Sequence, residues 1–223
     1  MTTGNVRRVA HAAAILVFAI AAAAAAVNRE LPASESNLLL ELEFASTPQA
    51  VRARVEPSMR DAVDRAQRAD SRFLIPAYWA AFVAAGIVLV VSRGSANRRF
   101  ALAVMLLITV AAAADYGEND AIGIALSAAP AEGAAPLIWA RVKWVAFFLA
   151  TAALVPPLVA ASRARGTHAT LTALCLAAAA VVGLAATAVF TSAMPYAVML
   201  LALGLFGLAL LFLWNPEYFA TTS

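Results

Sequence analysis

Residues 100–126 read FALAVMLLITVAAAADYGENDAIGIAL, and this stretch predicts both the class of fold and the place of an unusual polar cluster. The whole stretch is long enough to cross a bilayer as an α-helix, and its first half is almost entirely apolar. Near its end it carries Asp115, Glu118 and Asn119. Because ionisable groups inside a membrane normally face the interior of a helical bundle, we expect these side chains to point into the protein.

The composition of the 223-residue chain supports the membrane class. Hydrophobic residues make up 63% of it and charged residues 13%, whereas soluble domains have roughly 45–50% and about 25%. The formal net charge of +3 comes from arginines that gather beside apolar runs, so we expect no nucleic-acid partner. A single cysteine, Cys175, rules out an internal disulfide and a Cys-x-x-Cys redox pair.

Six apolar runs are long enough to span a bilayer, which predicts an all-α, polytopic helical bundle with residues 1–223 in one integral membrane domain. The runs cover about residues 9–27, 73–91, 100–126, 137–161, 169–190 and 196–214. The first run also resembles a secretory signal peptide, whose removal would leave five spans. We expect it to stay as an uncleaved anchor.

Arginines in the short connections predict the orientation of the bundle. They are Arg7 and Arg8 before the first span, Arg93, Arg98 and Arg99 after the second, and Arg163 and Arg165 after the fourth. With six spans all of them fall on one side, which is cytoplasmic by the positive-inside rule. Both termini are then cytoplasmic, and the polar segment 28–72 faces outward.

The outer segment 28–72 should contain short helices. Ser46 or Thr47 can cap a helix that begins at Pro48, and a second helix is expected to begin after Pro57 and to continue into the second span. The stretch LLLELEF at residues 38–44 alternates apolar and acidic residues, which suits either a short strand or an interfacial segment.

Two charged pairs support the second outer helix. Asp61 with Arg65, and Asp64 with Arg68, are spaced four residues apart, where opposite charges stabilise an exposed helix by roughly 0.2–0.5 kcal/mol each.

The polar residues of the third span have potential partners on its neighbours. At about 1.5 Å of rise per residue, Glu118 and Lys143 both lie about 27 Å from the cytoplasmic ends of their spans. Asp115, Glu118 and Asn119 share one helix face, which we expect to point toward Lys143, Arg141, Tyr78 or Asp70.

Three roles for this cluster stay open at the level of sequence. It can be a structural network of ion pairs that fixes the register of the helices. It can be a site for a small polar or lipid ligand, an ion or a proton that opens to the outer face. It can also be catalytic, with Asp115 or Glu118 as a general base.

We expect neither a metal nor a cofactor. His11 and His168 lie at the ends of two different spans, where an interfacial role is more common than haem ligation. Asp115, Glu118 and Asp70 could offer oxygens to a hard cation, but Lys143 competes for their charge.

Four segments carry a resemblance to a family: LELEFASTPQAV, RADSRFLIPAYWAA, AAADYGENDAI and RVKWVAFF. In this order they resemble a group of small, uncharacterised bacterial multi-pass membrane proteins with an Asp-x-x-Glu-Asn sequence at the end of a span. The resemblance covers about residues 40–150 and implies shared polar positions at Asp70, Asp115, Glu118, Asn119 and Lys143. At position 117 the chain differs from the group, because it has Gly117 where a bulky apolar residue is expected. Together with the Ala-rich spans, the resemblance implies a bacterial inner membrane.

The expected function is therefore that of an integral membrane protein that binds a small polar or lipid ligand, or a partner protein, at the cluster near the outer leaflet. The alternatives are a proton-coupled transporter, a lipid-modifying enzyme and an accessory subunit of a larger membrane complex. Membrane lipids are expected partners, and a protein partner or a homo-oligomer is open.

Overall fold

The computed structural model describes residues 3–35, 37–91, 95–127, 135–165, 167–189 and 191–214. Within these ranges the chain is all-α, with short 3-10 turns, a π-helical turn at Asp70–Leu74 and no strand. The α-helices are α1 (Thr3–Asn28), α2 (Leu38–Glu43), α3 (Pro48–Arg54), α4 (Arg60–Ala69), α5 (Ile75–Val91), α6 (Ser95–Leu126), α7 (Pro136–Arg165), α8 (Thr167–Ala188) and α9 (Met194–Trp214). The predicted all-α fold is confirmed.

Six helical segments of the described chain are long and apolar enough to cross a membrane. They are Gly4–Asn28, Pro57–Val91, Asn97–Leu126, Pro136–Ala160, Thr167–Ala188 and Thr191–Trp214. Each predicted apolar run overlaps one of these segments over nearly its whole length. The protein is therefore a helical membrane protein with the predicted number of spans.

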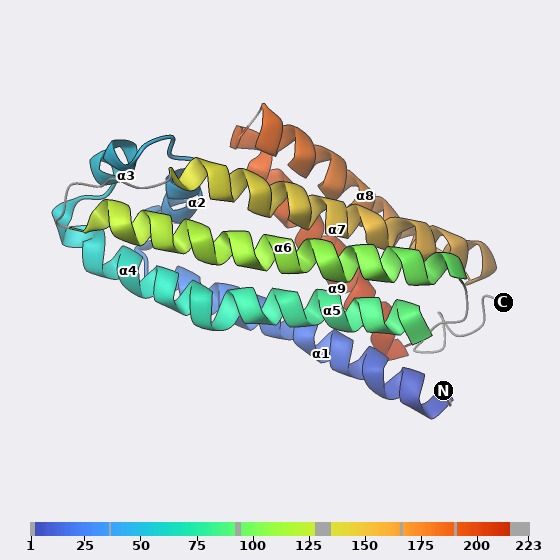
Figure 1. Ribbon diagram of the computed structural model, residues 1–223. Helices are drawn as coiled ribbons and strands as arrows, with labels where there is room; N and C mark the ends of the chain where they lie inside the picture. Colours follow the sequence, from blue (N-terminus) through green and yellow to red (C-terminus); the bar gives the residue numbers. More distant parts are fainter. Residues whose placement is uncertain are drawn as a thin grey trace.

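The spanning helices form a closed arrangement (Figure 1). Each of α5, α6, α7 and α8 packs against the next spanning helix along the chain, and α1 packs against both α5 and α9. Short connections place consecutive helices side by side. The long segment between α1 and α5 instead forms a cap at one end of the bundle. This end, with α2 and α3, is the one farther from the first turns of α1 (Figure 1).

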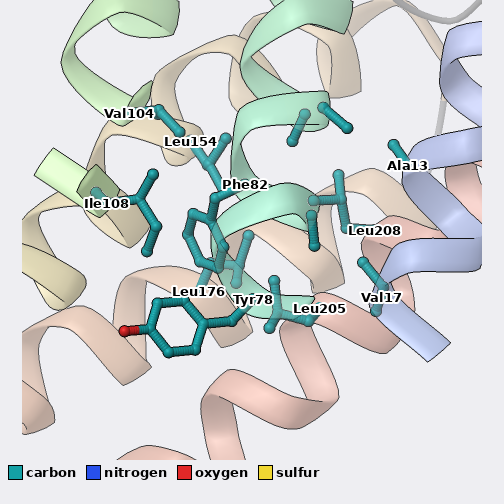
Figure 2. Close-up of a cluster of buried hydrophobic side chains, with 14 of the residues drawn as sticks. Ala13, Val17, Tyr78, Phe82, Val104, Ile108, Leu154, Leu176, Leu205 and Leu208 are labelled. Atoms are coloured by element: carbon teal, nitrogen blue, oxygen red, sulfur yellow. The ribbon is translucent and has the colours of Figure 1, made fainter. Parts of the chain in front are cut away.

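An apolar core fills the middle of the bundle (Figure 2). Phe82 of α5 lies between Ile108 of α6 and Leu208 of α9 in this view, and all three are buried. Ala13 of α1 has no exposed surface, because small side chains let this helix approach its neighbours closely. Packing in this core fixes the rotation of each span about its own axis. This rotation determines where the polar face of the span points.

The cap follows the local signals of its sequence. Thr47 caps α3, because its hydroxyl oxygen accepts a hydrogen bond of 3.1 Å from the backbone nitrogen of Ala50, and Pro48 is the first helical residue. Helix α4 continues through the π-helical turn into α5 without a break. Both predictions for this segment are confirmed.

Hydrogen bonds to the ends of the spans attach the cap. The side chain of Arg52 donates from Nε to the carbonyl oxygen of Ala125 at 2.6 Å, near the end of α6, where a cation also meets the negative end of the helix dipole. The backbone nitrogen of Leu137, at the start of α7, donates to the carbonyl oxygen of Ala45 at 3.3 Å. The cap is thereby fixed over α6 and α7.

For the cap, the structure excludes one of two open alternatives and corrects one predicted ion pair. Residues 38–43 form α2 rather than a strand, because Leu38 and Leu42 are four residues apart and both are buried against the spans, which fits the helical period. Arg65 pairs with Glu30 at 2.9 Å and not with Asp61.

The other expected pair is present, with Arg68 and Asp64 at 2.6 Å. Arg93 and most of the connection after Leu126 lie outside the described residues, as do the side chains of Arg163 and Arg165.

Candidate functional site

Lys143 is the centre of a buried ionic cluster. Its Nζ atom lies 2.9 Å from Oε2 of Glu118, 3.1 Å from Oδ1 of Asp115 and 3.0 Å from Oε1 of Glu43. The lysine is only 4% exposed and Glu118 only 1%. Lys143 is also the only lysine in the sequence. An ammonium has three hydrogens, so these carboxylates can use its whole donor capacity.

Three separate elements supply the cluster. Asp115 and Glu118 lie one turn apart on the same face of α6, Lys143 lies on the adjacent α7, and Glu43 is the last residue of α2 in the cap. The structure thus brings Glu118 and Lys143 together, as their equal depth indicated. The contact between Lys143 and Glu43 adds a link from the bundle to the cap.

Tyr78 extends the cluster onto α5. Its hydroxyl donates a hydrogen bond of 2.9 Å to Oδ2 of Asp115. Figure 2 shows the ring beside Phe82, with the hydroxyl directed away from the labelled apolar side chains. Asp115 therefore accepts from Tyr78 on one oxygen and from Lys143 on the other.

Asp70 and Asn119 form a neighbouring polar pair. The amide nitrogen of Asn119 donates to Oδ2 of Asp70 at 2.7 Å and to Oγ of Ser71 at 3.0 Å. Asp70 begins the π-helical turn between α4 and α5. Such turns insert a residue into a helix and often occur at functional sites. Asp70 is half-buried and forms no ion pair within the described residues.

Arg141 does not join the cluster. It is exposed on α7, because a residue two positions from Lys143 lies roughly 200° around the helix axis. Its expected contact with the carboxylates is absent from the described structure. Of the residues predicted for the site, Tyr78, Asp115, Glu118 and Lys143 are directly connected, and Asp70 with Asn119 lies beside them.

Glu43 was not predicted as a site residue. Its Oε2 accepts a hydrogen bond of 2.8 Å from the indole nitrogen of Trp144, while its Oε1 contacts Lys143. A helical interpretation of residues 38–43 would have placed Glu43 next to the buried Leu42, toward the bundle. The alternation of acidic and apolar residues left both a strand and an interfacial segment open, so the helical spacing that would have indicated Glu43 was not used.

Burial determines the acidity of Glu43, which lies outside the spans with 16% of its side chain exposed. Burial raises its pKa above the usual 4.5, the Lys143 ammonium lowers it in part, and the Asp115 carboxylate raises it further. One ammonium faces three carboxylates, so full ionisation would leave an excess negative charge in a medium of low dielectric constant.

Two adjoining cavities meet at the cluster. The outer cavity, of about 330 Å³, reaches from the cap to Glu118 and Asn119. The inner cavity, of about 410 Å³, reaches Asp115 and Lys143. The cavities share lining residues, which are Ala24, Glu43, Asp70, Leu74, Trp144 and Val198.

The inner cavity is lined on one side by α1 and α9. Most of its wall is apolar and comes from these two helices: Val17, Phe18, Ile20, Ala21, Ala24, Val198, Leu201, Ala202, Leu205 and Phe206. The rings of Phe18 and Phe206 stand edge to face with their centroids 6.0 Å apart. They are 42% and 50% exposed on the apolar outside of the bundle. Charged groups and apolar walls from α1 and α9 thus line one space.

The histidines are not part of this site. His168 lines a separate, mostly apolar cavity between α8 and α9, and His11 lies on α1 away from the lining of either cavity. In the part of the chain that the structure describes, no group of three or more His, Cys, Asp or Glu is arranged to hold a metal ion. The position central to the carboxylates is taken by Lys143.

Comparisons with known proteins assign no family to this chain. No family model matches it, and neither does any curated protein or solved structure. The resemblance to small bacterial membrane proteins thus stays a prediction, and the function has to be inferred from the site itself.

Proposed function

We propose that this membrane protein binds a small amphipathic molecule in the joined cavities, with the polar end of the molecule at the Lys143 cluster and its apolar part between α1 and α9. The observation that carries the proposal is the inner cavity, whose apolar walls end at charged groups. Its volume of about 410 Å³ falls in the usual range of small-molecule sites, roughly 300–1,000 Å³. A purely structural ion-pair network would not require this space.

The exposed rings in the wall of the inner cavity support entry from the lipid phase. Phe18 and Phe206 border the cavity and are exposed on the face that meets lipid. A molecule with an apolar part can partition into the bilayer first and then enter between these rings. The outer cavity gives its polar end a second route toward the cap.

A second candidate function is proton-coupled transport of the same molecule. It is favoured by the excess of carboxylates over ammonium groups around Lys143, because such a cluster can gain or lose a proton as the site fills. In that case Glu118→Gln would stop uptake driven by a pH gradient while binding persisted. Uptake that survived this substitution would contradict transport through Glu118.

We further propose a bacterial inner-membrane location with the cap outside and both termini inside. Arg7 and Arg8 lie in the first two turns of α1, and Arg98 and Arg99 lie in the first two turns of α6, at the end of the bundle away from the cap. The positive-inside rule supports a cytoplasmic position for this end.

The test of binding uses two neighbouring alanines of α1. Ala21 lines the inner cavity, whereas Ala22 does not, and both are exposed. In Ala21→Trp the indole should occupy the cavity, and in Ala22→Trp it should extend into lipid. Native mass spectrometry of protein released in mild detergent should show a retained small molecule in the wild type and in Ala22→Trp, and much less in Ala21→Trp.

Two other results would redirect the proposal. Equal retention in both variants, or a bare chain in all three, would count against binding in this cavity. A stoichiometric partner protein retained by all three would instead favour the accessory-subunit alternative.

A further inference from the structure

We infer that the molecule taken by the joined cavities is an organic cation with an apolar or aromatic body. This inference rests on the proposed binding function and adds the charge of the ligand to it. It follows from the charges, the aromatic rings and an unpartnered polar group that line the two cavities.

The lining is strongly acidic. Glu43 and Asp70 border both cavities, Glu118 borders the outer one and Asp115 the inner one. Among the described lining residues Lys143 is the only cation, and its ammonium is already shared by three carboxylates. An anionic headgroup would be repelled here, whereas a cation would offset the excess negative charge.

Asp70 is the carboxylate best placed to receive this cation. One of its oxygens accepts from the amide of Asn119, and no lysine or arginine of the described chain pairs with it. It lies at the junction of the cavities beside Glu43. A charge-assisted contact with a ligand would supply the counterion that Asp70 lacks.

Aromatic rings surround the same space. Trp144 borders both cavities, and Phe147, Tyr78 and Phe206 border the inner one. Lys143 Nζ lies 5.0 Å from the centre of the Trp144 ring, so this ring already faces a cation. Aromatic faces attract organic cations most strongly where water is excluded, as in cavities that recognise quaternary ammonium groups.

A separate sign of a missing partner comes from Gln67 in the wall of the outer cavity. The residue is 7% exposed, and its Nε2 atom has no hydrogen-bond acceptor among the described residues. Buried donors are normally satisfied. An oxygen carried by a bound molecule near Asp70 would satisfy this one.

The test compares three probes of similar size and different charge: 4-phenylbutylammonium, 4-phenylbutan-1-ol and 4-phenylbutyrate. Binding to the full chain in phosphatidylcholine nanodiscs is measured by calorimetry, with empty nanodiscs subtracted. We expect the cation to bind at least about tenfold more tightly than the alcohol, a difference of about 1.4 kcal/mol. The carboxylate should bind more weakly than the alcohol.

Two matched variants test whether Asp70 is the carboxylate that the cation contacts. In Asp70→Asn the preference for the cation over the alcohol should fall, while binding of the alcohol persists and shows that the protein is folded. Asp61→Asn removes the same charge from an exposed position on α4 that lines neither cavity, and it should behave as the wild type. An unchanged preference in Asp70→Asn would overturn the assignment to this residue.

The two proposals fail in different ways. Equal binding of cation and alcohol by the wild type, lost in Ala21→Trp, would leave the cavity as a binding site and overturn its selectivity for cations. Tighter binding of 4-phenylbutyrate than of the alcohol would also overturn the selectivity for cations. Binding of none of the probes would count against both proposals.

Discussion

At the scale of single residues, Lys143 holds together charges that could not otherwise be buried side by side. Its ammonium contacts Glu43, Asp115 and Glu118 at 2.9–3.1 Å. Removing one partner of a buried ion pair costs more than the pair contributes, because the remaining charges are left without compensation. The lysine is therefore essential to the stability of the site whatever the site binds.

Replacing Lys143 by methionine should lower the free energy of unfolding by about 3–5 kcal/mol, since the buried carboxylates lose their counterion. Thermal and denaturant unfolding in detergent at pH 7 measure the loss. The matched control is Arg141→Met on the same helix, where the exposed guanidinium lies outside the cluster and the change should be small. Equal losses in the two variants would contradict the central role of Lys143.

The acidity of Glu43 predicts a pH dependence with a definite sign. Because burial raises its pKa above 4.5, the folded state holds this proton more tightly than the unfolded state. The stabilisation from its protonated form is complete below pH 4.5 and is lost as pH rises through the folded-state value. Glu43→Gln keeps a neutral side chain throughout, so it should become more stable relative to the wild type as pH rises.

Melting temperatures of the two proteins between pH 4.5 and 8 provide this comparison. If the wild type instead became more stable relative to Glu43→Gln as pH rises, the ion pair with Lys143 would outweigh the cost of burying the Glu43 carboxylate.

At the scale of elements, close helix packing depends on glycines where a large ring meets a neighbouring backbone. Gly183 of α8 faces Phe148 of α7, and a Cβ atom placed there would lie 2.2 Å from Cζ of the ring. The ring is fully buried and has little freedom to move. Gly117 of α6 similarly faces Trp139 of α7, because a Cβ atom placed there would lie 2.9 Å from Cδ2 of the indole ring.

Gly183→Ala should therefore destabilise the protein by about 1–3 kcal/mol through overpacking between α7 and α8. Gly123→Ala is the matched control, because nothing lies within 4 Å of its added Cβ atom. There the better helix propensity of alanine should stabilise α6 by up to about 1 kcal/mol. Unfolding of both variants in detergent would test the pair, and a neutral Gly183→Ala would contradict the packing of these helices.

At the scale of the whole molecule, the closed arrangement of spans and the cap over one end define two different sides. The cap contains α2, α3 and α4, while the opposite end contains the first turns of α1 (Figure 1). The orientation proposed above places the cap, the cluster and both cavities toward the outside. A ligand would then reach the site from the outer leaflet or from the outer aqueous phase.

This orientation can be tested by cysteine labelling in a Cys175→Ser background, since Cys175 is the only native cysteine. Ser58 in the cap and Asn5 at the start of α1 are both exposed. In spheroplasts a membrane-impermeant maleimide should label Ser58→Cys directly and Asn5→Cys only after the membrane is opened. The reverse pattern would invert the proposed topology.

Hydropathy along the chain was sufficient to predict the six spans, the all-α fold and the matched depth of Glu118 and Lys143. These features depend on contiguous residues, on the fixed rise of a helix and on the thickness of the bilayer. Capping by Thr47 was equally local, because it involves residues only three positions apart.

Other features depended on the tertiary structure. Whether Lys143 or Arg141 faced the carboxylates was decided by the rotation of α7, which depends on how its apolar surface packs on α6 and α8. Glu43 reached the cluster only because α2 folds over the bundle and the cap bonds to the ends of α6 and α7. The cavities are spaces between helices distant in sequence, so no pattern along one segment could predict them. Local hydropathy thus set which segments cross the membrane, and packing between segments set which charges meet.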